Sequence, residues 1–186
     1  MDIDTLRTWV RDGHSLDYLL FWGHRQKRVG APDASCLSQW FPARFVVEGI
    51  TYPTAEHWMM AGKARLVRDD AMLDAILRAG EPGEAKALGR RVAGYDDAAW
   101  AAARSALVVD GNVAKFSQNP TLEAFLLNTG RRVLVEASPR DRIWGIGMGA
   151  SNPDAKDPMK WRGTNLLGFA LMETRVRLGG ALGGPD

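Results

Sequence analysis

Two side chains of opposite chemistry, Glu56 and Lys63, lie seven residues apart in the segment Tyr52–Ala64. If this segment is a helix, with 3.6 residues per turn, the two side chains project from one face. Met59 and Met60 lie between them and make that face otherwise apolar. An acid and an amine on an apolar face form a candidate catalytic site, whereas an exposed ion pair on a surface helix is the simpler alternative.

A second carboxylate, Asp141, lies near Trp144, much as Glu56 lies near Trp58. Apolar surroundings raise the pKa of a carboxyl group and lower that of a lysine, which favours acid–base and nucleophilic roles. Such a set suits cleavage at an anomeric carbon. One carboxylate can stabilise oxocarbenium character, while a second acidic group protonates the leaving group or activates water. The amine of Lys63 could instead trap the sugar as a Schiff base.

Motifs of other enzyme classes are absent or incomplete. Gly145-x-Gly147-x-x-Ala150 meets the loosest dinucleotide-binding pattern, but the prolines in residues 151–158 prevent the helix that this motif requires. The glycines therefore either let the backbone approach a ligand or permit tight turns. No Gly-x-Ser-x-Gly elbow occurs, Cys36 has no signature linking it to a histidine, and the three histidines show no metal-binding spacing. We expect neither a cofactor nor a metal.

The composition is that of an ordinary globular protein, with 186 residues of which 46% are hydrophobic and 25% charged. No apolar run approaches membrane-spanning length and the first residues are acidic, unlike a signal peptide, so we expect a cytoplasmic location without a membrane partner. A net charge of +2 disfavours a protein that mainly coats nucleic acid.

The pattern of residues predicts an α+β fold, because helices cluster in the middle of the chain and strands lie near both ends. The expected elements are a helix at 2–12, a buried strand at 18–22, a hairpin at 44–52 turning at Gly49, helices from 54 to 128, a strand at 132–136 and a last helix ending near 178. We expect an N-terminal extension at 1–17, one compact domain at 18–178 and a flexible tail at 179–186.

A basic loop, residues 24–28, follows the first strand and contains Arg25 and Arg28. These two arginines are candidate ligands for a phosphate group, although a solvated loop is the more frequent outcome of such a charge run. Farther along the chain, Asp96 or Asp97 can cap a helix that carries Trp100.

Eight motifs, in order over roughly residues 18–178, resemble the successive blocks of the YbiA/NADAR family. They are Leu37–Pro42, Tyr52–Trp58, Lys63-Ala64, Trp100, Lys115–Asn119, Leu126–Gly130, Asp141–Gly147 and Gly163–Arg175. The resemblance implies an α+β N-glycosidase-like domain. Members of this family hydrolyse the N-glycosidic bond of phosphorylated, ribosylated pyrimidine intermediates of riboflavin synthesis, and relatives remove ADP-ribose from modified guanine.

The resemblance also implies roles for individual residues. It places the family's glutamate at Glu56, its tryptophan at Trp100, its aspartate at Asp141 and its helix lysine at Lys63. Glu56 is then an acid–base or carbocation-stabilising group, Asp141 activates water or holds the ribose, and Trp100 forms a pocket wall. Lys63 is either a Schiff-base nucleophile or a cation that stabilises the leaving group. Further candidates for substrate binding are Trp22, Arg25, Arg28, Asn119, Trp144, Gly145, Gly147 and Asn165.

This chain departs from the family pattern at positions that affect the choice of substrate. Gln39-Trp40 stand where the family commonly has Asn-Phe, and Met60 and Gly62 replace polar residues. The expected substrate is a ribosylamino-pyrimidine 5′-phosphate. A hydrolase that removes ADP-ribose from guanine in nucleic acid, or a non-catalytic ADP-ribose-binding module, is the alternative.

Overall fold

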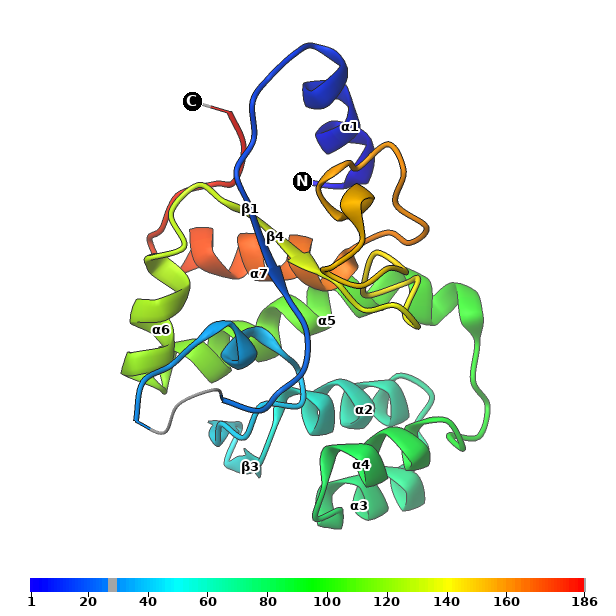
Figure 1. Ribbon diagram of the computed structural model, residues 1–186. Helices are drawn as coiled ribbons and strands as arrows, with labels where there is room; N and C mark the ends of the chain where they lie inside the picture. The colour runs from blue at the N-terminus through cyan, green and yellow to red at the C-terminus, as the bar shows by residue number, and fades with distance from the viewer. Residues whose placement is uncertain (27–29, 186) are drawn as a thin grey trace. The chain divides into compact units, whose positions relative to one another are not determined.

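The computed structural model describes residues 1–26 and 30–185, and the chain forms two compact units. Unit 1 comprises Met1–Ser38 and Thr121–Asp186, and unit 2 comprises Gln39–Pro120. Unit 1 is therefore built from both ends of the chain, coloured blue and yellow to red in Figure 1, and unit 2 from its middle.

Unit 2 begins with a hairpin of β2 (Phe45–Val47) and β3 (Ile50–Tyr52), which pair antiparallel. The turn residues Glu48 and Gly49 both have positive φ, at 51° and 78°, as the tightest two-residue hairpin turns require. The rings of Phe45 and Tyr52 face each other across the pair, with their centroids 5.6 Å apart. The predicted hairpin and its turn at Gly49 are confirmed.

The remaining elements of unit 2 are four helices, and α2 contacts each of the other three. They are α2 (Ala55–Leu66), α3 (Asp70–Arg78), α4 (Pro82–Gly89) and α5 (Asp97–Ser117). Figure 1 shows α3 and α4 next to α2. Eight of the twelve α2 residues are buried. The alternative of an exposed surface helix at this position is therefore wrong.

Small residues allow α2 and α5 to approach each other closely. A Cβ atom on Gly111 would lie 2.1 Å from Cδ1 of Trp58, and one on Gly62 would lie 2.5 Å from the Leu107 methyl groups. The indole Nε1 of Trp58 donates a hydrogen bond of 2.8 Å to the Leu107 carbonyl oxygen. Larger side chains at either glycine would separate the two helices.

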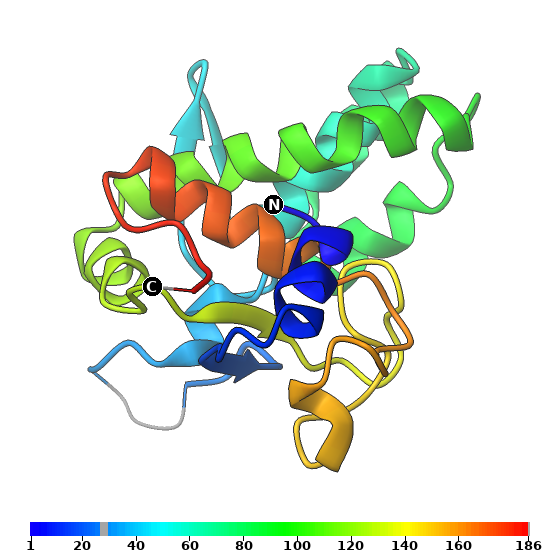
Figure 2. The same cartoon turned by 90° about the horizontal axis from the view of Figure 1, so that it is seen from above.

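Unit 1 is built around two parallel strands, β1 (Tyr18–Phe21) and β4 (Val133–Glu136), with Tyr18 opposite Val133. Val133, Leu134 and Val135 are fully buried, as is usual for parallel strands. The remaining elements are α1 (Ile3–Arg11), α6 (Pro120–Leu127), α7 (Leu166–Arg177) and two 3-10 helices, η1 (Ala34–Leu37) and η2 (Pro153–Lys156). Helix α7 packs along β4, as Figures 1 and 2 show.

The fully buried Arg175 of α7 connects several segments of unit 1. Its Nη1 donates to Thr129 Oγ1 at 2.7 Å and to the Arg132 carbonyl at 3.0 Å, and its Nε donates to the Ala181 carbonyl at 2.8 Å. Burial, together with the charge of Arg132, lowers the pKa of Arg175 to about 10. One side chain thus joins the start of β4, the end of α6 and the C-terminal residues.

The α+β fold class predicted from the sequence is confirmed. The first strand ends at Phe21, one residue earlier than predicted, because pairing with β4 ends where Phe21 meets Glu136. Trp22 is 66% exposed, so the prediction that the buried strand includes it is wrong. At the C-terminus, Gly180 and Gly184 donate backbone hydrogen bonds to Arg175 and Arg131. Across the described part of the chain, no helix combines the length and apolarity needed to span a membrane.

Replacing Arg175 with alanine should lower the free energy of unfolding by about 3 kcal/mol or more, because the buried Thr129 Oγ1 and two part-buried carbonyl oxygens would lose their donor. Arg177 on the same helix is the control, since its Nε pairs with Glu173 at the surface and its removal should cost under about 1 kcal/mol. Urea titration of both variants measures the difference. A similar loss of unfolding free energy in the Arg175 and Arg177 variants would contradict the role assigned to Arg175.

Candidate functional site

The residues predicted to form the site are distributed between the two units. Unit 2 holds Glu56, Lys63, Trp100 and Asn119, and unit 1 holds Trp22, Arg25, Asp141, Trp144, Gly145, Gly147 and Asn165. Arg28, a predicted phosphate ligand, lies outside the described residues.

Glu56 lies in the first turn of α2 and is 2% exposed. Its backbone N–H donates to the Gln39 carbonyl at 3.0 Å, and Thr54 caps the helix before it. A helix N-terminus carries partial positive charge, which favours a carboxylate at this position. Since Glu56 is almost completely buried, it is not half of an exposed surface ion pair.

The neighbouring His57 is fully buried and fixes the start of α2. Its Nε2 lies 3.1 Å from the Ala79 carbonyl, and its Nδ1 lies 2.8 Å from Thr54 Oγ1. A carbonyl can only accept, so Nε2 carries the proton, and Nδ1 of the neutral ring accepts from the threonine hydroxyl. Burial lowers the pKa of His57, although the Ala79 carbonyl opposes the change. His57 therefore has a structural role as a neutral side chain.

Lys63 lies two turns after Glu56, and its Nζ is 3.9 Å from the centroid of the Tyr95 ring. No carboxylate of the described residues forms an ion pair with this amine. Burial lowers the pKa of Lys63, the positive charge of Arg90 lowers it further, and the negative charge of Asp97 opposes both. A larger fraction of the amine is therefore neutral than in a solvated lysine, which favours nucleophilic attack.

Trp100 lies at the start of α5 and is 8% exposed. Asp96 caps this helix, because its Oδ1 accepts from the N–H groups of Ala98 and Ala99 at 2.8 and 3.0 Å. The predicted cap is confirmed. Arg104 and Leu107 follow Trp100 at intervals of four and three residues, so the three side chains share one face of α5.

Asp141 of unit 1 begins a tight loop. Its Oδ1 accepts from the backbone N–H groups of Ile143 and Trp144 at 2.9 and 2.7 Å, and its carbonyl accepts from Gly147 at 2.9 Å. Its other carboxylate oxygen, Oδ2, accepts no hydrogen bond from the residues that the structure describes. The loop therefore orients the carboxylate through one oxygen and leaves the second for another partner.

Contacts within unit 1 account for Gly145, Gly147 and Asn165. A Cβ atom on Gly145 would lie 2.8 Å from the Glu136 carbonyl, and Gly147 has a φ of +69°. Asn165 is fully buried, and its amide accepts from Glu136 N at 2.9 Å and donates to Leu134 O at 2.9 Å. Tight turns and protein packing are thus sufficient reasons for these residues, without a ligand.

Three other predicted substrate-binding residues show no geometry specific to a ligand. The amide nitrogen of Asn119 donates to the carbonyls of Arg44 and Lys115 at 3.0 and 2.7 Å, so both of its hydrogens are used. Trp22 and Arg25 are exposed. Their roles in binding remain predictions.

Tyr95 and Arg90, which lie near Lys63 in unit 2, were not predicted as site residues from the sequence. Neither belongs to a recognisable motif. The available signal was the position of Tyr95 directly before a predicted cap. Their closeness to Lys63 depends on the packing of α2, α4 and the start of α5.

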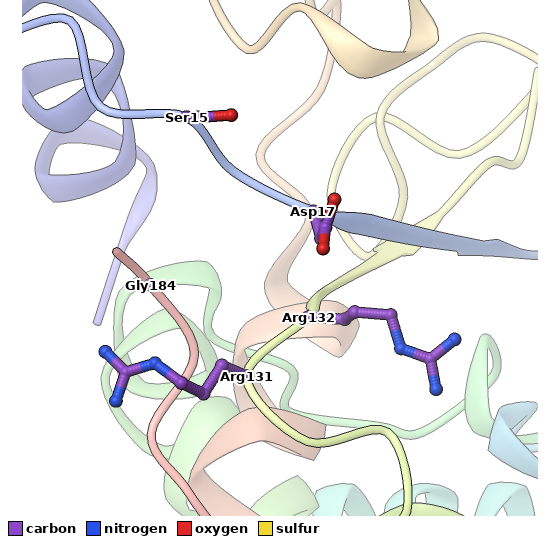
Figure 3. Close-up of a pocket in the computed structure, with 5 residues that line it drawn as sticks. All are labelled: Ser15, Asp17, Arg131, Arg132 and Gly184. Carbon is purple, nitrogen blue, oxygen red and sulfur yellow. The ribbon is translucent and has the colours of Figure 1, made fainter. Parts of the chain in front are cut away.

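A cavity of about 240 Å³ in unit 1 is lined by Ser15, Asp17, Arg131, Arg132 and Gly184. Figure 3 shows the side chains of Arg131 and Arg132 extending in different directions, so they do not converge on one ligand. None of the predicted site residues lines this cavity. In residues 1–26 and 30–185, no three His, Cys, Asp or Glu side chains group as metal ligands would.

Comparisons with known proteins agree with the resemblance seen in the motifs. The family model of the NADAR domain matches residues 20–179. The chain is 40% identical over 163 residues to N-glycosidase R617 of Acanthamoeba polyphaga mimivirus, covering 85% of this chain and 94% of that protein. It is 32% identical over 132 residues to N-glycosidase YbiA of Escherichia coli K12, covering 71% and 74%. The NMR structure of E. coli YbiA matches with a TM-score of 0.70 and 28% identity, covering 89% of this chain and 88% of that chain.

Neutral His57 should make the stability of the protein depend on pH. Its pKa in the folded state is below the ordinary 6.5, so its contribution is complete above about pH 6.5 and is lost as the pH falls toward the folded value. Urea titrations near pH 7.5 and 5.5 should show a larger loss of unfolding free energy for the wild type than for His57→Gln, which cannot titrate there. An equal loss of unfolding free energy in the wild type and in His57→Gln would refute the assignment of His57 as a buried neutral side chain.

Proposed function

The chain belongs to the NADAR domain family, and from this premise we propose that it is an N-glycosidase that cleaves ribose 5-phosphate from an aminopyrimidine. Relatives named N-glycosidases in mimivirus and E. coli support the reaction class. The observation that carries the proposal is the pair on α2: a buried carboxylate at Glu56, and at Lys63 an amine whose pKa is lowered by burial.

In the reaction, the bond between the anomeric carbon and the base nitrogen breaks, and the electron pair leaves with the base. An oxygen atom from water joins the carbon, and the base nitrogen gains a proton. Glu56 either supplies that proton or stabilises positive charge on the sugar, depending on its protonation state. Because its side chain is excluded from bulk water, either electrostatic effect is stronger than at the surface.

Lys63 offers a covalent route for the same cleavage. The neutral amine attacks the anomeric carbon and displaces the base, and opening of the sugar ring gives an imine to Lys63. Water then hydrolyses this imine, releasing the sugar and regenerating the amine. The lowered pKa of Lys63, caused mainly by burial, supports this route, since attack needs the unprotonated amine. As a cation, Lys63 would instead stabilise the departing base.

The roles proposed for Trp100 and Asp141 rest on their family motifs and local geometry. Trp100 is a buried aromatic on α5, suited to the wall of an apolar pocket. Asp141 is held by its loop with Oδ2 available, which suits activation of water or a hydrogen bond to a ribose hydroxyl.

Replacing Glu56 with glutamine should lower kcat for release of ribose 5-phosphate by about 100-fold or more, because the amide can neither donate an acidic proton nor carry negative charge. Glu48→Gln, in the exposed hairpin turn, is the control and should keep the wild-type rate. Circular dichroism and the melting temperature establish that both variants fold. A folded Glu56→Gln enzyme with unchanged kcat would show that the role proposed for Glu56 is wrong.

Borohydride added during turnover should reduce an imine and attach the sugar to the peptide that contains Lys63, as read by mass spectrometry. Lys63→Arg keeps the charge but should give no adduct and lose at least about 100-fold in kcat. If Lys63→Arg turns over normally and the wild type yields no adduct, the covalent route is wrong.

The same assays decide between substrates. An oligonucleotide carrying ADP-ribosylated guanine should turn over more slowly than the pyrimidine substrate. Preference for the oligonucleotide would establish the alternative hydrolase, and tight ADP-ribose binding with no turnover of either substrate would indicate a binding module.

A further inference from the structure

Three cationic side chains of unit 2, Lys63, Arg90 and Arg104, form no ion pair with the described residues. Asp97 is the acid that acts on Lys63, and it raises the pKa of that amine less than burial lowers it. Like charges that lie close together repel unless a counter-ion is present.

Arg90 is held near Lys63 by the contact between α4 and α2. Gly89, the last residue of α4, packs against Met60, since a Cβ atom there would lie 2.1 Å from the Met60 sulfur. Met60 and Lys63 are three residues apart on α2 and therefore lie on adjacent turns of one face. Arg90 follows Gly89 directly and is exposed, and its charge lowers the pKa of Lys63.

Arg104 approaches the same place from α5. Leu107 packs on Gly62, the residue before Lys63, and Arg104 lies one turn earlier than Leu107 on the same face of α5. The Nε of Arg104 is buried and has no hydrogen-bond acceptor among residues 1–26 and 30–185. Leaving a guanidinium N–H without an acceptor is costly, so a missing partner is indicated.

Tyr95 contacts Lys63 and is affected by the charge of Arg104. Its ring lies 3.9 Å from Nζ of Lys63. Burial and a hydrogen bond with Asp97 raise the pKa of its hydroxyl, and the positive charge of Arg104 opposes this rise. Arg90 thus acts on Lys63, and Arg104 acts on the tyrosine that Lys63 contacts. These three cations of unit 2 are termed the cationic cluster.

We propose that Arg90 and Arg104 bind a phosphate group of the substrate next to Lys63. A guanidinium presents planar, paired N–H donors that match phosphate oxygens, so the ligand would satisfy Arg104 Nε and neutralise the cationic cluster. The proposal rests on the proposed function, and it assigns phosphate recognition to residues other than Arg25, which lies on an exposed segment of unit 1. The ligand chemistry is a ribose phosphate, either the 5′-monoester of a ribosylamino-pyrimidine or the diphosphate of ADP-ribose.

The test compares Arg104→Ala and Arg90→Ala with Arg91→Ala, an exposed neighbour that removes the same charge. For the phosphorylated pyrimidine substrate, Arg104→Ala should raise KM by about 10-fold or more, the loss expected for one charge-assisted hydrogen bond, and Arg91→Ala should leave it within about twofold. For the dephosphorylated nucleoside, all three variants should match the wild type. An equal loss on both substrates would overturn the proposal, because it would show a structural role.

Calorimetry separates this proposal from the proposed function. Inorganic phosphate and ADP-ribose are titrated into the folded wild type and the same variants, with no turnover required. Weaker binding of both ligands in Arg104→Ala, but not in Arg91→Ala, supports the phosphate site even if neither substrate is hydrolysed. If Arg104→Ala weakens the binding of ADP-ribose but not of inorganic phosphate, the group bound at this site is the diphosphate of ADP-ribose. Unchanged binding of both ligands in Arg90→Ala and Arg104→Ala would rule out the site.

Discussion

The close packing of α2 against α3, α4 and α5 is the constraint on which unit 2 depends. Gly62 and Gly111 bring α2 and α5 together without intervening side chains, and the Trp58 indole donates to the Leu107 carbonyl across the contact. At such short separation α2 has little contact with water. The burial of Glu56 and the lowered pKa of Lys63 both follow from this packing, because each group loses part of its hydration.

The same packing concentrates positive charge at one place in unit 2. Arg90, directly after α4, acts on Lys63, and Arg104 of α5 acts on Tyr95, which Lys63 contacts. Asp97 offsets the positive charge at Lys63 only partly. Such a group of like charges destabilises the folded protein because the charges repel one another. The buried Nε of Arg104 adds to this cost, since it has no hydrogen-bond acceptor among the described residues. Functional sites commonly retain such unfavourable charge interactions, because a bound ligand of opposite charge neutralises them.

Unit 1 uses its polar residues differently. Asn165 hydrogen-bonds β4 through its amide, Arg175 joins three segments through its guanidinium, and one oxygen of Asp141 is held by the backbone of its own loop. These interactions join the region around β4 and hold the Asp141 loop through internal hydrogen bonds. Residues that resemble ligand contacts in a motif can therefore be required mainly for the fold.

The sequence by itself determined the features that depend on neighbouring residues. The α+β class, the hairpin turning at Gly49 and a cap at Asp96 or Asp97 follow from local periodicity, glycine conformation and capping chemistry. The structure confirms the class and the hairpin and shows that Asp96 is the cap. The motifs also identified the family, which the comparisons confirm.

Only the tertiary structure decided what surrounds each candidate side chain. Tyr95 is 32 residues from Lys63, and Arg104 is 41 residues away, and no local pattern relates them. The burial of Glu56, the neutral tautomer of His57 and the structural use of Asn165 likewise depend on segments distant in the chain. Desolvation and charge at a site are sums over everything packed around it, so they become defined only when the helices have assembled.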